Sequence, residues 1–343
     1  MRVRELADWL GCTFEGEGER EVEGVAALDS AGAGQVSFLG NRKAAALASQ
    51  SAAGCLIVPA DFVNTGGRTV IRATDPRSAF ARVVSRFHPT PAPGPGVHPT
   101  AVIGEDVELG EGVSIGPNAV LGKGVQVGQR SRIGAGCVLG SRVSLGQDCI
   151  LHANVTLYDD IEIGDRAILH SGCVLGADGF GFVLTGDRYE KFPQVGRVRI
   201  GHDVEVGANS TIDRAALGVT WIGDGVKLDN MVHVGHNCRL GKHVVVAAQT
   251  GFSGGVVVED YAVIGGKVGI GDKARIESRA VLGSGCGVLT SKVIRGGEVV
   301  WGTPARPLKE VLEQLANLAR LPRMREELTA LKAQVGKLME GKH

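Results

Sequence analysis

The sequence predicts a mainly β protein built around a parallel β-helix, with a small α/β domain before it and helices after it. Apolar residues recur at every sixth position from Ile103 to Leu175 and again from Ile222 to Val300. Glycine makes up 52 of the 343 residues, whereas aromatic residues are only 4%. Three sides of six residues close a triangular coil of about 18 residues, and such coils stack about 4.8 Å apart. An aliphatic column inside that stack accounts for the scarcity of aromatic residues.

Residues 1–95 lack this period and are expected to form the α/β domain. RVRELADWLG and PRSAFARVVSRF have the pattern of amphipathic helices. VSFLG, GCLIVP and RTVIRA have the pattern of strands. The proline-rich stretch PTPAPGPGVHP ends the domain as a stiff linker.

Residues 96–303 are expected to form the β-helix. With a short run at Ile200, Val206 and Ile212, the hexapeptides give about ten coils. We expect the glycine after each inward aliphatic residue to permit a corner conformation that a Cβ would resist. The register breaks before Ile200 and again before Ile222, and such insertions are extruded as loops, often on the binding face. The first insertion carries four aromatic residues, which suit a lid or a subunit contact as well as an inert loop: Phe180, Phe182, Tyr189 and Phe192.

Residues 304–343 are expected to be helical. One apolar stripe runs along Leu308, Val311, Leu315 and Leu318, and Pro322 is predicted to start a second helix. The stripe of this second helix has coiled-coil spacing, at Met324, Leu328, Leu331, Val335 and Leu338. Stripes this narrow predict helices that pack on each other or on neighbouring chains.

Charge and composition exclude several classes of protein. Lys+Arg and Asp+Glu are both 37, and this balance argues against nucleic acid as a partner, because binding phosphates needs a basic surplus. No apolar run is long enough to cross a bilayer and the N-terminus lacks a signal peptide, so we expect no transmembrane segment. Seven cysteines without a CxxC pair favour a reducing, cytoplasmic compartment.

Two histidines raise the possibility of a metal site. His152 and His170 are one coil length apart in the sequence, hence stacked on adjacent coils. They resemble the arrangement in zinc hydrolyases of this fold, which take three imidazoles from two subunits. The third ligand would then be His98 or His202 of a neighbouring chain. The alternative is that His152 and His170 are only polar corner residues.

His236, in LDNMVHVGHNCRLG, is the stronger candidate for chemistry. It lies two residues after the inward Val234, and Gly254 follows one coil later. An imidazole beside a glycine N–H can serve as base and oxyanion donor in acyl transfer, and glycine lets a thioester approach the backbone. Asp229, on the preceding side, would orient the imidazole or bind substrate. The alternative is that His236 is only a corner histidine.

Several stretches spread along the whole chain resemble the UDP-3-O-acylglucosamine N-acyltransferases of lipid A biosynthesis. They are VSFLGNRK, GADGFGF, FPQVGRVRIG, STIDRAAL, LDNMVHVGHN and GTPARP. The resemblance implies left-handed coils, a homotrimer and active sites in the clefts between subunits. It further implies no bound cofactor, because the 3-hydroxyacyl donor is carried on the phosphopantetheine of acyl carrier protein. The acceptor would be UDP-3-O-acylglucosamine, at the inner face of the inner membrane.

The resemblance also implies roles for individual residues. His236 would take a proton from the glucosamine 2-amine, Gly254 N–H would bind the oxyanion, and Asn237 would contact the phosphopantetheine arm. In the N-terminal domain, Phe38 would stack on uracil and Asn41 would contact the nucleotide sugar. The terminal helices would dock the carrier protein.

The sequence departs from the family pattern at two positions. Ala44 stands where family members carry a second aromatic wall for uracil. Lys273 stands where they carry a second histidine two coils past the base, and it would offer positive charge to the substrate.

Two other functions fit the sequence less well. The first is an acetyl-CoA-dependent hexapeptide acetyltransferase acting on a nucleotide sugar, which has no need of the FLGN domain or long docking helices. The second is a trimeric zinc hydrolyase or a non-catalytic scaffold. The acyl chain length is not predicted, because residues of two chains would shape the groove that holds the chain.

Overall fold

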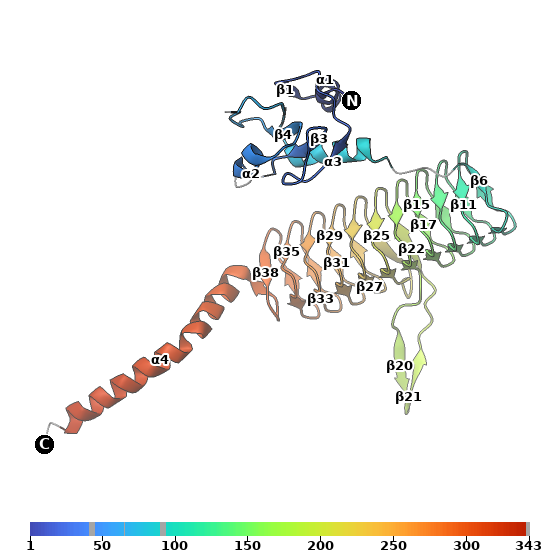
Figure 1. Ribbon diagram of the computed structural model, residues 1–343. Coiled ribbons are helices and arrows are strands. Elements are labelled where there is room, and N and C mark those ends of the chain that lie inside the picture. Colours follow the sequence, from blue (N-terminus) through green and yellow to red (C-terminus); the bar gives the residue numbers. More distant parts are fainter. Residues whose placement is uncertain (41–44, 65, 90–93, 341–343) are drawn as a thin grey trace. The chain divides into compact units, whose positions relative to one another are not determined.

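A computed structural model describes residues 1–40, 45–64, 66–89 and 94–340 of the protein. The chain divides into two compact units, Met1–Ala92 and Pro93–His343. Figure 1 shows mixed helices and strands in the first unit, and a stack of coils followed by a helix in the second.

The first unit is a five-stranded sheet with three helices, which confirms the predicted α/β fold. The strand order is β1-β5-β4-β3-β2, and all neighbours are parallel except β1, which runs antiparallel to β5. The strands are β1 (Thr13–Glu15), β2 (Gly24–Val25), β3 (Gln35–Phe38), β4 (Cys55–Pro59) and β5 (Val70–Ala73). The helices are α1 (Val3–Leu10), α2 (Ala45–Gln50) and α3 (Pro76–Phe87).

Local sequence explains both predicted helices of this unit. Helix α1 buries Val3, Leu6 and Leu10, which are spaced three and four residues apart and so share one helical face. It ends at Gly11, whose φ of 70° is one that glycine adopts readily. Helix α3 begins after Asp75, whose carboxylate accepts hydrogen bonds from two backbone N–H groups of the first turn.

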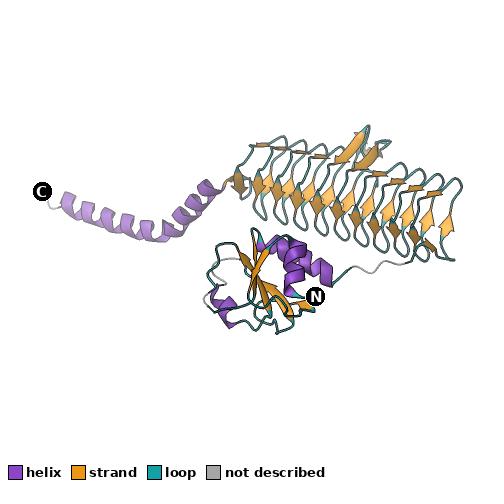
Figure 2. Ribbon diagram, turned by 90° about the horizontal axis from the view of Figure 1, so that it is seen from above, coloured by secondary structure: helices purple, strands orange, loops and turns teal. Residues whose placement is uncertain are grey.

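The second unit is a left-handed parallel β-helix, as the resemblance implied. Its strands are mostly two residues long, and each pairs in register with the strand one coil further along the chain, as Leu121 pairs with Leu139. Figure 2 shows the stacked coils from above. The strands form three sheets, here called sheets 1, 2 and 3, in which all pairs are parallel except the last pair of sheet 3.

Sheet 1 contains the strands that carry His233, Gly251 and Gly269 at outward positions. Its strands are β7 (Val102–Ile103), β10 (Val120–Leu121), β13 (Val138–Leu139), β16 (Thr156–Leu157), β19 (Val174–Leu175), β24 (Thr211–Ile212), β27 (His233–Val234), β30 (Gly251–Phe252), β33 (Gly269–Ile270) and β36 (Gly287–Val288).

Sheet 2 contains the two longer strands beside the insertions. Its strands are β8 (Glu108–Leu109), β11 (Gln126–Val127), β14 (Ser144–Leu145), β17 (Glu162–Ile163), β22 (Arg197–Ile200), β25 (Val219–Ile222), β28 (Arg239–Leu240), β31 (Val257–Val258), β34 (Arg275–Ile276) and β37 (Val293–Ile294).

Sheet 3 begins and ends the coil. Its strands are β6 (Gly96–Val97), β9 (Ser114–Ile115), β12 (Arg132–Ile133), β15 (Ile150–Leu151), β18 (Ile168–Leu169), β23 (Glu205–Val206), β26 (Lys227–Leu228), β29 (Val245–Val246), β32 (Val263–Ile264), β35 (Val281–Leu282), β38 (Val299–Trp301) and β39 (Arg306–Pro307).

The core of this unit is a single apolar column, running from Val113 to Ala305. The second residue of most strands points inward and is buried, as with Leu139 and Leu240. Burying an aliphatic side chain stabilises a fold by about 1.5–3 kcal/mol, so the column is the main source of stability.

A Cβ is resisted at the corner glycines, as predicted, but at most of them φ is not the reason. Most glycines that follow the inward residue, such as Gly128, do not adopt a positive φ, whereas Gly176 does, with φ 90°. They are needed because the next coil lies too close, and a Cβ at Gly128 would lie 2.5 Å from the carbonyl carbon of Gly146. The left-handed conformation falls two residues later, where Asn154 (φ 62°) and Arg166 (φ 56°) adopt it.

Charged residues at these corners pair from coil to coil. Arg130 binds the neighbouring Asp148, with Nη2 2.6 Å from Oδ2. Arg166 and Asp203 make the same contact, and the bond from Arg166 lowers the pKa of the Asp203 carboxyl. Such exposed pairs align the edges of the stack and add little stability.

The first insertion forms a hairpin of β20 (Phe182–Thr185) and β21 (Arg188–Lys191). It projects from the coil in Figure 1. Phe182, Leu184 and Tyr189 share one face, because cross-strand partners in a hairpin point to the same side. These three side chains are exposed.

Residues 308–340 form one helix, α4 (Leu308–Glu340), so the predicted second helix starting at Pro322 is wrong. Proline removes one backbone bond, but the flanking Leu, Arg, Glu and Ala residues favour helix strongly enough to continue it. Val311 is buried beside Gly302, whereas Leu315 and Leu318 are exposed. Among the helices that the structure describes, none is both long enough and apolar enough to span a bilayer.

Candidate active site

His236 lies at a corner of the coil, two residues after the inward Val234 of β27. Its Nδ1 lies 3.0 Å from the side-chain oxygen of Asn237. That oxygen also accepts a bond from Ala216 N, and the amide group of Asn237 donates to Leu217 O. Ala216 and Leu217 belong to the second insertion, which therefore holds the residue that contacts the imidazole.

Gly254 faces the same imidazole from the next coil. A Cβ on Gly254 would lie 2.6 Å from Nε2 and from Cε1 of His236. Only glycine leaves room for the ring in this position. Among the described residues, the N–H of Gly254 has no hydrogen-bond partner. The structure thus brings together the two groups that the sequence paired.

A groove of about 630 Å³ runs past these two residues along sheet 1. The outward residues of sheet 1 change in size along the stack. The outward residue is Val102, Val120 or Val138 in early coils, but Gly251 and Gly269 in the coils after His233. A Cβ at Gly251 or Gly269 would meet nothing within 4 Å, so these glycines leave open space in the groove.

The base of the β20–β21 hairpin covers the other side of His236. A Cβ on Gly179 would lie 2.6 Å from Cβ of His236. Phe180 lines the groove and is 86% exposed, and its ring packs edge-on against Phe182. Gln194 is buried under the hairpin and donates a bond to Phe192 O. The first insertion therefore contributes an apolar wall to the site.

Asp213 is a groove residue that the sequence analysis missed. It is 7% exposed and lies at the corner one coil before Gly235. Its Oδ2 is 3.7 Å from Nε2 of His233, whose Nδ1 contacts Thr211 Oγ1 at 2.8 Å. Burial raises the pKa of the Asp213 carboxyl. The second insertion lengthens the coil here, so that Thr211 pairs with His233. Counting about 18 residues per coil therefore does not align Asp213 with Gly235.

Asp229 lies at a different corner from His236 within the same chain. It follows β26 of sheet 3 and lines a separate groove of about 640 Å³ with His170 and Lys227. Its carboxylate accepts bonds from Asn230 N at 2.7 Å and from Ala248 N at 3.1 Å. One chain therefore does not bring Asp229 to the imidazole.

Lys273 follows Asp272, which lines the His236 groove. The Lys273 backbone is left-handed, with φ 53°. Its side chain is 76% exposed, and Nζ is 3.9 Å from Oδ2 of Asp272. Counted from the sequence, Lys273 lies two coils past the imidazole, next to the groove residue Asp272.

Phe38 ends strand β3 in the first unit. It is half-buried, and its ring stacks on Phe80 with 4.7 Å between centroids and 22° between planes. Asn41 and Ala44, the other positions singled out in this segment, lie outside the described residues.

The histidines of the zinc hypothesis do form a pair. The rings of His152 and His170 stack with centroids 4.9 Å apart, and Nε2 of His170 is 3.0 Å from Glu205 Oε1. Burial, and then the charge of His170, lower the pKa of His152. His202 Nδ1 accepts a bond from Asp165 N. Across the described parts of the chain, no three or more His, Cys, Asp or Glu side chains are grouped to hold a metal ion.

The chain matches two kinds of family model. Residues 19–86 match one described as UDP-3-O-(3-hydroxymyristoyl) glucosamine N-acyltransferase. Residues 106–141, 142–177 and 220–254 match the bacterial transferase hexapeptide model of six repeats.

Curated relatives match over most of the chain. The UDP-3-O-acylglucosamine N-acyltransferase of Methylacidiphilum infernorum is 53% identical over 74% of this chain and 72% of its own. The protein of the same name from Pseudomonas fluorescens is 39% identical over 99% of this chain and 97% of its own. Among solved structures, the UDP-N-acetylglucosamine acyltransferase of Francisella novicida superposes with a TM-score of 0.49 and 23% identity, over 64% of this chain and 73% of its own.

Proposed function

The chain belongs to the UDP-3-O-acylglucosamine N-acyltransferase family, and we propose that it moves a 3-hydroxyacyl chain from acyl carrier protein to the 2-amine of UDP-3-O-acylglucosamine. One observation carries the mechanism. Nε2 of His236 lies against Gly254, whose N–H is unpartnered among the described residues, on an open groove.

His236 is the general base of this reaction. The oxygen of Asn237 accepts from Nδ1–H, so the lone pair of the imidazole is on Nε2, at the groove. Nε2 takes a proton from the amine as the nitrogen attacks the thioester carbonyl. The C–N bond forms, the C–S bond breaks, and the thiol leaves with a proton from the imidazolium.

Gly254 N–H stabilises the oxyanion that forms on the thioester carbonyl during the attack. A preorganised donor with no competing partner suits this role, because it need not be released from another bond. Asp213 adds negative charge near the two histidines of the groove and favours the imidazolium that forms in the transition state.

The long groove supports a fatty-acyl donor over acetyl-CoA. Open space at Gly251 and Gly269 extends two coils past the imidazole, far beyond what an acetyl group fills. No bound cofactor is needed, since the donor carries its own phosphopantetheine arm. Asn237 contacts that arm near the thioester, and Lys273 offers positive charge beside Asp272.

The active unit is a homotrimer. Sheet 3 exposes a row of valines at outward positions, and helix α4 exposes a run of leucines, both of which suit contacts between copies: Val245, Val263, Val299, Leu315, Leu318 and Leu328. Asp229 lies on another corner of its own chain, so it joins His236 from a second copy. The helices also dock the carrier protein.

The first unit binds the nucleotide of the acceptor. Phe38 stacks on uracil with the ring face that Phe80 does not cover, and Asn41 contacts the nucleotide sugar. We place the reaction in the cytoplasm, at the inner face of the inner membrane. All seven cysteines are free thiols, which suits a reducing compartment.

The test is an assay of purified protein and of His236→Ala with UDP-3-O-acylglucosamine, offering 3-hydroxyacyl carrier proteins or acetyl-CoA as donor. His236→Ala should stay folded and lower kcat by about 10²–10⁴, the range for losing a general base. His202→Ala, at the equivalent corner next to sheet 2, is the matched control. A near-normal rate for His236→Ala contradicts the base. Acetyl-CoA as the preferred donor, or stoichiometric zinc, supports the alternatives.

A further inference from the structure

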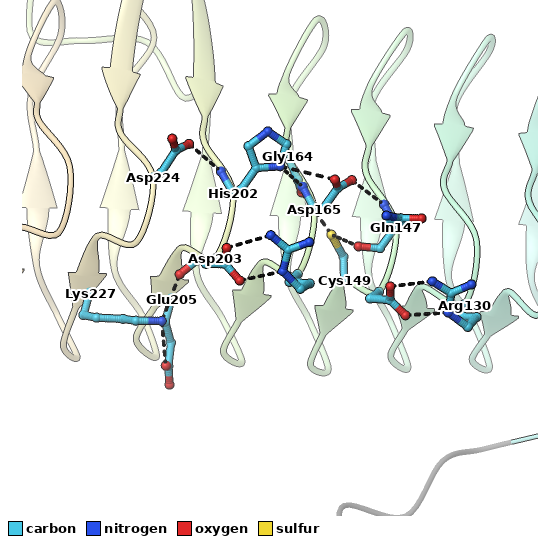
Figure 3. A network of polar contacts seen from close by, with 12 residues as sticks. Arg130, Gln147, Cys149, Gly164, Asp165, His202, Asp203, Glu205, Asp224 and Lys227 are labelled. Carbon is cyan, nitrogen blue, oxygen red and sulfur yellow. Dashed lines mark hydrogen bonds and ion pairs between the residues drawn. The ribbon is translucent and has the colours of Figure 1, made fainter. Parts of the chain in front are cut away.

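Small polar side chains inside the coil bind backbone oxygens at the corners of the next coil. Each donor lies two residues before an inward residue and reaches a carbonyl 15 positions later. Figure 3 shows one such bond, from Cys149 Sγ to Gly164 O at 3.2 Å. The others span 2.7–3.1 Å: Ser131 to Gly146, Cys137 to His152, Thr250 to Gly265 and Cys238 to Ser253.

One of these bonds lies directly beneath the candidate active site. Cys238 Sγ is 3.1 Å from Ser253 O. The Ser253 carbonyl and the Gly254 N–H belong to the same planar trans peptide, so they point in opposite directions. Holding the carbonyl toward the buried thiol therefore turns the N–H of Gly254 outward, to the side of the groove.

This outward N–H differs from those at several other corners. At some equivalent positions a carboxylate from the next coil caps the N–H, as Asp165 caps Gln147 and Asp224 caps His202 in Figure 3. The residue one coil after Gly254 is Asp272, and its carboxylate approaches Lys273 instead. The N–H of Gly254 thus has no cap among the described residues.

We propose that Cys238 is a positioning residue for this acyl transfer, whose thiol holds the Ser253–Gly254 peptide so that Gly254 N–H faces the developing oxyanion. The inference rests on the proposed function, because it gives Gly254 N–H the role of oxyanion donor. Cys238 itself touches neither substrate nor base.

The local backbone needs such a restraint. Two glycines follow Ser253, and glycine pairs rotate more freely than other residues. Cys238 is the hydrogen-bond donor that reaches the Ser253 carbonyl among the described residues. If the peptide turned over, a carbonyl oxygen would point at the oxyanion position. Cys238 is fully buried, and burial raises its pKa to about 12, so the thiol keeps its proton and remains a donor.

The chain offers well-matched variants for a test. Valine fills the same interior position in other coils, at Val125, Val143 and Val256, so Cys238→Val fits the core and lacks the donor. Serine occupies the position at Ser131 and binds the carbonyl there, so Cys238→Ser keeps the donor. Cys137→Val removes the same kind of bond several coils from the site and serves as the control.

Steady-state kinetics of the full-length protein should separate these variants. We expect Cys238→Val to lower kcat about 10-fold with KM for both substrates unchanged, a part of the 10²–10³ that a lost oxyanion donor costs. Cys238→Ser should stay within about 2-fold of the wild type, and Cys137→Val should keep its kcat. Both valine variants should have the same Tm.

Three outcomes overturn the inference. They are a wild-type kcat for Cys238→Val, a loss that Cys238→Ser does not restore, and an equal loss of kcat in Cys137→Val. His236→Ala, measured alongside, keeps the two proposals apart. If it is inactive while Cys238→Val behaves like Cys137→Val, the positioning role alone is wrong. If His236→Ala is fully active, the proposed function fails instead.

Discussion

The side-chain oxygen of Asn237 lies 3.0 Å from Nδ1 of the adjacent His236, while its amide is bonded to the backbone of Ala216 and Leu217. These backbone bonds fix which end of the amide faces the ring. An orienting acceptor at Nδ1 selects one tautomer and leaves Nε2 as the basic nitrogen. The second insertion of the coil therefore acts on the imidazole through Asn237.

Asn237→Gly should lower kcat by roughly 10–100-fold, because the imidazole loses its orienting partner but not its place, and should raise KM for the acyl donor, whose phosphopantetheine arm loses a contact. Glycine suits the native φ of 61°, so backbone strain does not confuse the result. Asn154→Gly, at a corner with φ 62°, is the control and should keep full activity. Equal kinetics for the two variants would show that Asn237 is only a corner residue.

Gly254→Ala tests the fit between the glycine and the imidazole. The added Cβ would lie 2.6 Å from Nε2 of His236, so the ring must move, and kcat should fall by about 100-fold. The comparison is Gly251→Ala, whose Cβ meets nothing within 4 Å and enters open groove, so that its effect should fall on KM. A Gly254→Ala enzyme with normal kcat would place the base elsewhere.

Asp213→Asn should stabilise the protein at neutral pH and weaken catalysis. Burial raises the pKa of this carboxyl above its unfolded value, so the folded protein holds a proton that the unfolded chain releases. Wild-type stability therefore falls as pH rises through that window, starting near pH 4, whereas the asparagine variant has no such loss. At pH 7 its Tm should be about 2–4 °C higher.

The pH series is the decisive measurement for Asp213. The difference in Tm should vanish below about pH 4, where both folded and unfolded carboxyls are protonated. The kcat of Asp213→Asn should fall about 10-fold, because negative charge no longer favours the imidazolium. A constant difference in Tm at all pH values would mean that the charge of Asp213 is not responsible.

The β-helix could be predicted from the sequence because each coil repeats one local rule. An inward residue every six positions specifies strand, corner and stacking at once, so the pairing of Leu121 with Leu139 follows from counting. The rule also placed His236 against Gly254, since both lie in uninterrupted coils. Nothing in it distinguishes a glycine needed for φ from one needed for close approach, which depends on the spacing between coils.

The missed features all depend on contacts that a period cannot encode. The position of Asp213 is not predicted because the insertion shifts its register, and its approach to His233 depends on that shift. Asp229 and His236 follow different sheets of one chain, and the period does not encode contacts between copies of the chain. Pro322 does not divide the helix, because helix propensity summed over 33 residues outweighs one lost bond.

Phe38 gives a prediction for the first unit that separates packing from binding. One face of its ring stacks on Phe80, 4.7 Å away, and the other is assigned to uracil. Phe38→Leu keeps an apolar contact with Phe80 but loses the flat ring. We expect KM for the nucleotide sugar to rise about 10-fold, within the roughly 1–3 kcal/mol that stacking a base contributes. The value of kcat should not change, because stacking binds ground and transition states alike.

The same experiment has a conservative partner in Phe38→Tyr, which keeps the ring and should keep KM. Thermal unfolding checks whether leucine has damaged the core around Phe80, since a packing defect would lower Tm in proportion to the cavity it leaves. If KM rises only in variants whose Tm also falls, the ring serves the fold rather than the nucleotide. A rise in KM for Phe38→Leu at unchanged Tm, absent in Phe38→Tyr, requires the free face of the ring to contact the acceptor.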